Sequence, residues 1–301
     1  MSSCPKEFQG RIDNKVNWRD IVAWIGDLPP MPKVAAKAIS LIEKQETTAK
    51  ELQDLLNNDP ALAAKILKIA NSAMFSRQRE INTIQQAVMI IGFKALKGII
   101  MAASLRQLNK RFTKIDRLVW ENSMGTAMAS LSIAKALKKH YAEEIFLLGL
   151  LHNLGQVAML VNETTRNKYN LVLKLIEEEE CTYVEAEHKV YGFSNPLIGA
   201  LLAKKWNFPA DTCQIILHHQ DQLPQDAPSS PLEEMVAIVK AGEALCHLTG
   251  IGSPSGYPSR YETLKDCLVY CGAAEDNTDE LIEMLTNNTQ ELFEQEGSLY
   301  T

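Results

Sequence analysis

Hydrophobic residues recur along most of the chain at intervals of three and four, which is the spacing of one face of an α-helix. In the segment NDPALAAKILKIANSA, the apolar side chains of Leu62, Ile66 and Ile69 share such a face. Asp59 can cap the start of this helix, and Pro60 takes its first position. The pattern and the capping residues therefore predict the same helix.

Capping chemistry of this kind marks two further helices. In INTIQQAVMIIG, Thr83 and Gln86 have capping-box spacing, and Gly92 stands where a left-handed terminating residue belongs. In SNPLIGALLAKKW, Asn195 can cap a helix and Pro196 takes its first position, as Asp59 and Pro60 do in the first segment. The same reasoning predicts helices over 33–44, 48–57, 93–109, 116–139, 142–161, 166–180, 182–191, 209–219, 231–249, 259–271 and 277–295. No segment carries a convincing strand pattern, so the predicted fold class is all-α.

Composition indicates a folded globular protein rather than a nucleic-acid-binding one. Of the 301 residues, 46% are hydrophobic and 23% are charged, and the formal net charge is −6 at pH 7. A chain of this charge has no global positive field to attract nucleic acid. The start of the chain lacks the apolar core of a signal peptide, and apolar runs such as 145–151 are too short to span a bilayer. We therefore expect a cytoplasmic protein that contacts neither nucleic acid nor membrane.

Two changes in composition suggest how the chain is organised. The basic stretch LNKRFTKIDR, at 108–117, can join two helical lobes, and the loop DQLPQDAPSSP, at 221–231, precedes a last helical section. The predicted parts are an N-terminal extension (1–19), a main domain (20–220) with lobes of about 20–110 and 111–220, and a C-terminal helical section (221–301).

The segments LPPMPKVAAKAISLIEK, ELQDLLNNDPALAAKILKIANSAMF and INTIQQAVMIIGFKALKGIIMAASL resemble the N-terminal lobe of the HDOD family, the HD-related output domain of bacterial signalling proteins. The resemblance continues through WENSMGTAMASLSIAKAL and LLGLLHNLGQVAML to PLIGALLAKKWNFPADTCQIILHH, over roughly residues 20–220. It implies an all-helical fold related to HD phosphohydrolases and used mainly as a regulatory, protein-binding module. Other signalling proteins are the implied partners, and the oligomeric state stays open.

The resemblance also implies where a metal site would lie. An HD site takes a histidine, a His-Asp pair and a later aspartate, because a divalent ion needs several ligands and some anionic charge. In this chain Asn122 occupies the place of the first histidine, His152 is retained, and Asn153 replaces the aspartate. Gly242, with Glu243 beside it, stands at the last aspartate. One ligand of four remains, so we expect no catalytic residue, no metal and no cofactor.

Further residues near these positions leave one alternative open. Gln156 stands where the HD-GYP relatives that cleave cyclic nucleotides have a lysine. His218 and His219 look like the histidine pair of those enzymes, but adjacent helical residues point about 100° apart. His152 is either a core histidine bonded between helices or a residual ligand. The alternative function is thus a divergent metal-dependent phosphohydrolase or nucleotide sensor that uses His152, His218 and His219.

Overall fold

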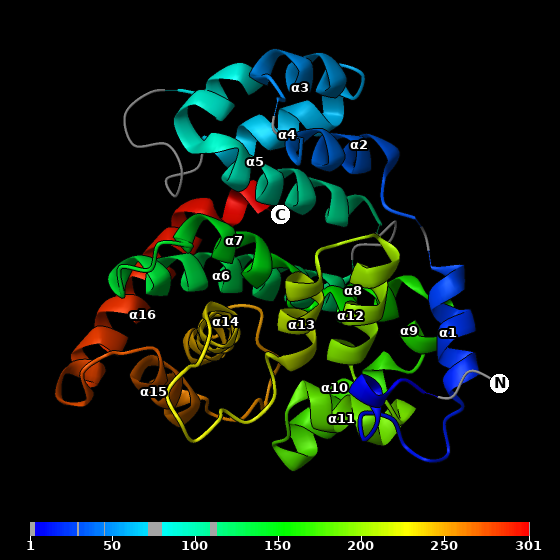
Figure 1. Ribbon diagram of the computed structural model, residues 1–301. Coiled ribbons are helices and arrows are strands. Elements are labelled where there is room, and N and C mark those ends of the chain that lie inside the picture. Colours follow the sequence, from blue (N-terminus) through cyan, green and yellow to red (C-terminus); the bar gives the residue numbers. More distant parts are fainter. Residues whose placement is uncertain (1–3, 29, 45, 72–79, 109–112, 301) are drawn as a thin grey trace.

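The computed structural model describes residues 4–28, 30–44, 46–71, 80–108 and 113–300 (Figure 1). Within these ranges the chain is helical and contains no strand; the only extended pairing is an isolated bridge between Ile12 and Phe193. The predicted all-α class is confirmed. Residue 109 of one predicted helix, and residues 109–112 of the predicted linker at 108–117, fall outside the described ranges.

The helices form an N-terminal group, a central group and a C-terminal group along the chain (Figure 1). The N-terminal group is α1 (Trp18–Asp27), α2 (Lys33–Ile42), α3 (Ala49–Leu56), α4 (Pro60–Ala70) and α5 (Ile84–Leu108). The central group is α6 (Lys114–Ala136), α7 (Ala142–Leu151), α8 (Leu154–Val161), α9 (Glu163–Arg166), α10 (Tyr169–Glu179), α11 (Tyr183–Tyr191), α12 (Asn195–Lys205) and α13 (Ala210–His218). The C-terminal group is α14 (Pro231–Thr249), α15 (Tyr261–Tyr270) and α16 (Thr278–Tyr300), and short 3₁₀ turns lie at Lys6–Phe8 and Glu275–Asn277.

The structure contains the predicted helix ends whose capping residues lie within a few positions of the helix. Asp59 Oδ1 accepts a hydrogen bond from the Leu62 amide at 3.0 Å, and Thr83 Oγ1 accepts one from the Gln86 amide at 3.1 Å. Gly92 has a φ of +77° and interrupts α5, as expected of a helix-terminating glycine. The chain then resumes as a helix toward α6.

The structure differs from the predicted helices in several places. α12 begins at Asn195 with Ser194 as its N-cap, one residue earlier than expected. The single helix predicted over 142–161 is divided into α7 and α8 at His152 and Asn153, where the Asn153 backbone leaves the helical region. α1 was not predicted, because its buried face consists of little more than Ile21 and Ile25.

α6 is the central helix of the fold, and it is enclosed by α7, α14 and α16 (Figure 1). Its residues from 122 to 131 are buried on all sides, and small side chains alternate with methionines there. Gly149 lets α7 approach α6 closely, since a Cβ at this position would stand 2.9 Å from the Ala127 Cα. On the other side of the core, α12 packs between α8 and α13.

Two 18-residue stretches, Ile84–Met101 and Glu144–Val161, are apolar enough to cross a bilayer, by length and composition only. The first is bent at Gly92. The second is divided between α7 and α8, and 83% of it is buried inside the fold. Burial in the protein core explains the apolar character of the second stretch.

Candidate functional site

Polar side chains from α6, the α7–α8 junction, α13 and α14 meet inside the protein. Asn122 lies on α6, His152 and Asn153 lie between α7 and α8, His219 ends α13, and Glu243 lies in the middle of α14. The exposed fraction is 0% for His152, 1% for His219 and 7% for Glu243. Because buried polar groups are costly unless they are paired, this cluster is the first candidate for a functional site.

The two histidine rings face the Glu243 carboxylate. His152 Nε2 lies 3.9 Å from Glu243 Oε1, and His219 Nε2 lies 3.9 Å from Glu243 Oε2. The two rings pack edge to face, with centroids 5.2 Å apart. One ligand atom from each of the three residues lies within 4.8 Å of the others. One turn further along α14, His247 Nε2 approaches Glu243 Oε1 to 3.7 Å.

Backbone carbonyls determine which nitrogen of each ring carries the proton. His152 Nδ1 lies 2.6 Å from the Gly149 oxygen, and His219 Nδ1 lies 2.8 Å from the Ile216 oxygen. Since a carbonyl can only accept, both Nδ1 atoms donate, and a neutral ring then has a bare Nε2 lone pair. Both Nε2 lone pairs are therefore directed at the carboxylate.

The electrostatics of the cluster favour neutral rings and a charged carboxylate. Burial lowers the pKa of His152 to about 4, against the attraction of Glu243, and burial also lowers the pKa of His219. Burial acts to raise the pKa of Glu243, but the histidines around the carboxylate outweigh it, so this pKa lies below its ordinary value. At neutral pH the rings of His152 and His219 are therefore unprotonated beside the Glu243 carboxylate.

Asn153, at the position of the HD aspartate, is fully engaged in hydrogen bonds to α6. Its Oδ1 accepts from Ser123 Oγ at 2.6 Å, and its Nδ2 donates to the Val119 oxygen at 3.0 Å. An aspartate here would place a second acceptor against the Val119 carbonyl. The amide therefore fits this position better than a carboxylate would.

Asn122, at the position of the first HD histidine, contacts His152 directly. Its Oδ1 lies 3.1 Å from His152 Nε2, while its Nδ2 has no partner among the described residues. Two acceptors face one another in this orientation. Either the amide is flipped, so that Nδ2 donates to Nε2, or a cation lies beside both atoms.

Gly242 and His218, which the sequence also offered as site positions, lie outside the cluster. Gly242 packs against α6, and a Cβ there would stand 2.2 Å from Ser130 Oγ, so Glu243 and not Gly242 reaches the cluster. His218 is partly exposed and lies 2.7 Å from Asp221 Oδ2. The structure thus brings together Asn122, His152, His219 and Glu243, whereas Asn153 is bonded to α6, and His218 and Gly242 lie outside the cluster.

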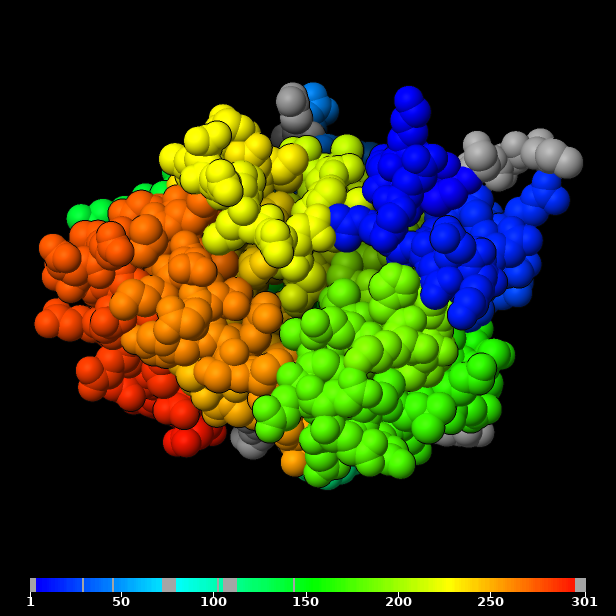
Figure 2. Space-filling model, turned by 90° about the horizontal axis from the view of Figure 1, so that it is seen from below, coloured from blue at the N-terminus to red at the C-terminus, as the bar shows by residue number. Residues whose placement is uncertain are grey.

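His218 faces the N-terminal segment, which packs on the lower face of the molecule (Figure 2). Arg11 Nη2 lies 3.0 Å from His218 Nδ1 and also pairs with Asp221. The divergence of adjacent helical side chains, expected from the sequence, thus separates His218 from His219.

A second buried carboxylate, Glu187 on α11, is not predicted by the sequence. Glu187 accepts hydrogen bonds from Tyr169 Oη at 2.5 Å, from the Asn195 amide at 2.7 Å and from Gln156. Burial raises the pKa of its carboxyl to about 7. The segment YVEAEHKVY has the composition of an exposed helix face, so nothing in the sequence marks this residue as buried. Gln156 is directed toward Glu187.

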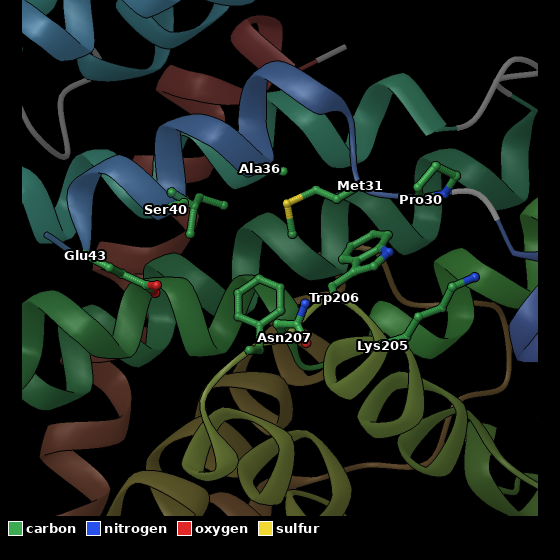
Figure 3. Close-up of a pocket in the computed structure, with 10 residues that line it drawn as sticks. Pro30, Met31, Ala36, Ser40, Glu43, Lys205, Trp206 and Asn207 are labelled. Atoms are coloured by element: carbon green, nitrogen blue, oxygen red, sulfur yellow. The ribbon is translucent and has the colours of Figure 1, made fainter.

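A surface hollow of about 410 Å³ lies between α2 and the end of α12 (Figure 3). Met31, Glu43 and Trp206 line it, and Glu43 pairs with Lys97 at 2.6 Å. Lys205, at its edge, donates to backbone carbonyls at the end of α1. None of the described residues that line this hollow is a histidine, so they offer no metal-binding set.

The helices and the central cluster define an all-helical, HD-related protein. Residues 28–222 match the model of the HDOD domain, so the chain belongs to the HDOD family. Its fold is that of an HDOD domain protein of unknown function from Geobacter sulfurreducens, with 24% identity, a TM-score of 0.69, and coverage of 91% of this chain and 96% of that one.

Two further solved structures share the fold. A Shewanella amazonensis SB2B protein, provisionally named a phosphohydrolase, has 22% identity, a TM-score of 0.67 and coverage of 91% and 97% of the two chains. A Marinobacter aquaeolei VT8 protein, provisionally named a signal transduction protein, has 18% identity, a TM-score of 0.65 and coverage of 94% of this chain and 66% of that one.

Among curated proteins, an uncharacterized protein of Treponema pallidum is 25% identical over 224 residues, which are 71% of this chain and 42% of the relative. The uncharacterized protein YuxH of Bacillus subtilis is 30% identical over 70 residues, 23% of this chain and 17% of that protein. The chain therefore spans less than half the length of these relatives. α14, which supplies Glu243, lies beyond the matched domain.

Proposed function

We propose that this protein is a non-catalytic HDOD module that acts in the bacterial cytoplasm, in signal transduction, through contacts with other signalling proteins. The observation that carries the proposal is the burial of the central cluster. His152 and His219 are 0% and 1% exposed, and Glu243 is 7% exposed. Hydrolysis of a phosphodiester requires the substrate to reach a metal-activated water, and a catalytic metal keeps an open coordination position for it.

The side chains around the cluster also favour a non-catalytic role. Asn153 has both ends of its amide occupied by α6, and Gln156 bonds to Glu187. Neither residue supplies the charge that a metal-dependent phosphohydrolase needs at these positions. A signalling role is in keeping with the HDOD domain and with the name of the Marinobacter relative.

Exposed apolar side chains indicate where a protein partner can bind. Met89 and Ile90, just before the bend in α5, are 75% and 48% exposed. Adjacent exposed apolar side chains of this size are typical of contact surfaces, and methionine adapts well to different partners. Leu171 on α10 is 53% exposed and offers a matched control.

Site-specific photocrosslinking in the native cell tests the contact role. A photoreactive residue at position 89 should capture a defined protein, and the same residue at position 171 should not. Met89→Glu should reduce capture by a probe at position 90, whereas Leu171→Glu should leave it unchanged. Equal capture from positions 89 and 171 would refute this choice of surface.

The alternative, a metal-dependent phosphohydrolase, is favoured by one observation, the proximity of His152, His219 and Glu243. Both functions are tested by incubating the protein with bis(p-nitrophenyl) phosphate or a cyclic dinucleotide in the presence of Mn²⁺ or Fe²⁺. The proposal expects no product above a metal-only blank. Turnover that requires metal and disappears in Glu243→Gln would establish the alternative.

A further inference from the structure

Two histidine nitrogens face a buried carboxylate at the centre of the protein, and neither nitrogen is hydrogen-bonded to it. His152 and His219 each donate Nδ1–H to a backbone carbonyl, so their Nε2 atoms are bare. Both Nε2 atoms face the Glu243 carboxylate at 3.9 Å, which is beyond hydrogen-bond distance. Asn122 Oδ1 lies 3.1 Å from His152 Nε2. Lone pairs that converge in this way on a buried carboxylate repel one another unless a cation lies among them.

We infer that His152, His219 and Glu243 bind one divalent transition-metal ion, held as a structural ion inside the helical core. This ligand set is not the one obtained by transferring the HD positions to this sequence, since it uses His219 and Glu243. The inference goes beyond the proposed function and does not depend on it.

The distances come close to those of a real metal site. With bonds of about 2.1 Å, a tetrahedral metal spaces its ligands about 3.4 Å apart. The two histidine–carboxylate distances are 3.9 Å, and the largest separation of the three ligand atoms is within 4.8 Å. The two histidine–carboxylate distances therefore have to shorten by roughly half an ångström, and the widest of the three separations by up to roughly 1.4 Å. Rotations of the three side chains can supply shifts of this size. Two imidazoles and a carboxylate are a set that suits zinc, iron or manganese.

The surroundings of the ligands resemble the outer shell of metal sites. Ligating histidines commonly donate their other ring N–H to a backbone carbonyl, and both rings do so here. Gln220 Nε2 donates to Glu243 Oε2 and so orients the carboxylate. These contacts hold the three ligands in place without a metal and leave their remaining lone pairs free to bind one.

A fourth ligand is available within the protein. His247 Nε2 is buried, has no hydrogen-bond partner in the described part of the chain, and lies 3.7 Å from Glu243 Oε1. Asn122 Oδ1 is a second choice, on the opposite helix. With four protein ligands the site is closed, which is the coordination of structural rather than catalytic zinc. A closed site agrees with the near-complete burial of the cluster.

The experiment measures metal in protein purified without a histidine tag, and then titrates zinc(II), manganese(II) or iron(II) into chelator-treated protein by calorimetry. We expect one ion per chain for at least one of these metals, and a melting temperature that rises when the metal is added. Glu243→Gln and His219→Gln should weaken binding roughly 100-fold or more, since even outer-shell changes cost 10–100-fold. His218→Gln, which changes the adjacent histidine outside the cluster, should bind as the wild type does.

Several results would overturn the inference. The inference is contradicted if the wild-type protein binds none of the three metals. It is also contradicted if Glu243→Gln leaves the affinity unchanged, or if His218→Gln loses as much binding as the ligand variants. The wild-type stoichiometry decides the matter even where a ligand variant does not fold. X-ray absorption at the metal edge should show imidazole nitrogens in the bound ion's shell. A metal-loaded protein that also turns over a phosphodiester would refute the proposed function and leave the metal site standing.

Discussion

Gly155 is the position where adding one methyl group should disturb the fold most directly. A Cβ on Gly155 would stand 1.9 Å from the Asn195 oxygen, 2.7 Å from the Asn195 carbonyl carbon and 2.8 Å from the Gly199 nitrogen. All three atoms belong to the backbone of α12, so no side chain can rotate away. Gly155→Ala must therefore push α8 and α12 apart.

The size of the effect follows from these distances. Carbon atoms in contact lie about 3.5 Å or more apart, so the two helices must separate by roughly 1.5 Å. Overpacking of a core costs about 1–3 kcal/mol, and a contact this short falls at the upper end. Alanine recovers about 1 kcal/mol over glycine by helix propensity. We expect the free energy of unfolding to fall by about 2 kcal/mol, which is about a 30-fold change in the unfolding equilibrium.

The assay is urea unfolding followed by far-ultraviolet circular dichroism and tryptophan fluorescence, with coincident transitions required. Gly26→Ala is the matched control, because a Cβ on this α1 glycine meets no atom within 4 Å. The control should be neutral or stabilising by up to about 1 kcal/mol. If Gly155→Ala were as stable as Gly26→Ala, the close packing of α8 against α12 would be refuted.

Three further predictions concern buried polar residues. The pKa of Glu187 is raised to about 7 from an unfolded value near 4.5, so the contribution of this carboxyl to stability falls by about 3 kcal/mol as the pH rises through this window. Glu187→Gln should lack this contribution when unfolding is measured at pH 5 and pH 8, and the same pH dependence in variant and wild type would contradict it. Asp116→Asn breaks a buried ion pair in which Arg166 donates to Asp116 at 2.6 and 2.9 Å, and it should lower the free energy of unfolding in urea by about 3 kcal/mol. The control Arg117→Gln breaks an exposed pair with Glu121 and should cost under about 1 kcal/mol. Equal effects of the two changes would contradict this prediction. Asn153→Asp loses the hydrogen bond to the Val119 oxygen and should lower the free energy of unfolding by about 1–3 kcal/mol at pH 7. Part of this loss should be recovered at pH 4.5, where the new carboxyl is more often protonated and can donate. A melting temperature equal to that of the wild type at pH 7 would show that the amide is not needed.

The helices could be predicted from the sequence because their signals are local. Asp59 and Thr83 cap helices within three residues, and Gly92 interrupts one through its own backbone conformation. α1 could not be predicted, because part of its stability comes from Lys205, which donates to carbonyls at its end from 177 residues or more away in the chain. Such a contact leaves no trace in a local pattern.

The site could be predicted only in part, because its assembly depends on how the helices pack. The sequence correctly separates His218 from His219, since their directions follow from helix geometry. It does not reveal that α13 brings His219 within contact of His152, or that α14 is rotated so that Gly242 touches α6 and Glu243 faces inward. One residue along a helix decides which side chain is buried with the histidines.

This rotation changes what a rebuilt HD site would require. Gly242→Asp cannot restore a ligand, because even its Cβ would stand 2.2 Å from Ser130 Oγ. The carboxylate of the cluster is already present as Glu243, on a helix beyond the matched domain at residues 28–222. An ion bound by Glu243, His152 and His219 would therefore join the C-terminal helices to the HDOD domain. A ligand that binds only the folded state stabilises that state. The metal would therefore stabilise the packing of the C-terminal helices against the HDOD domain.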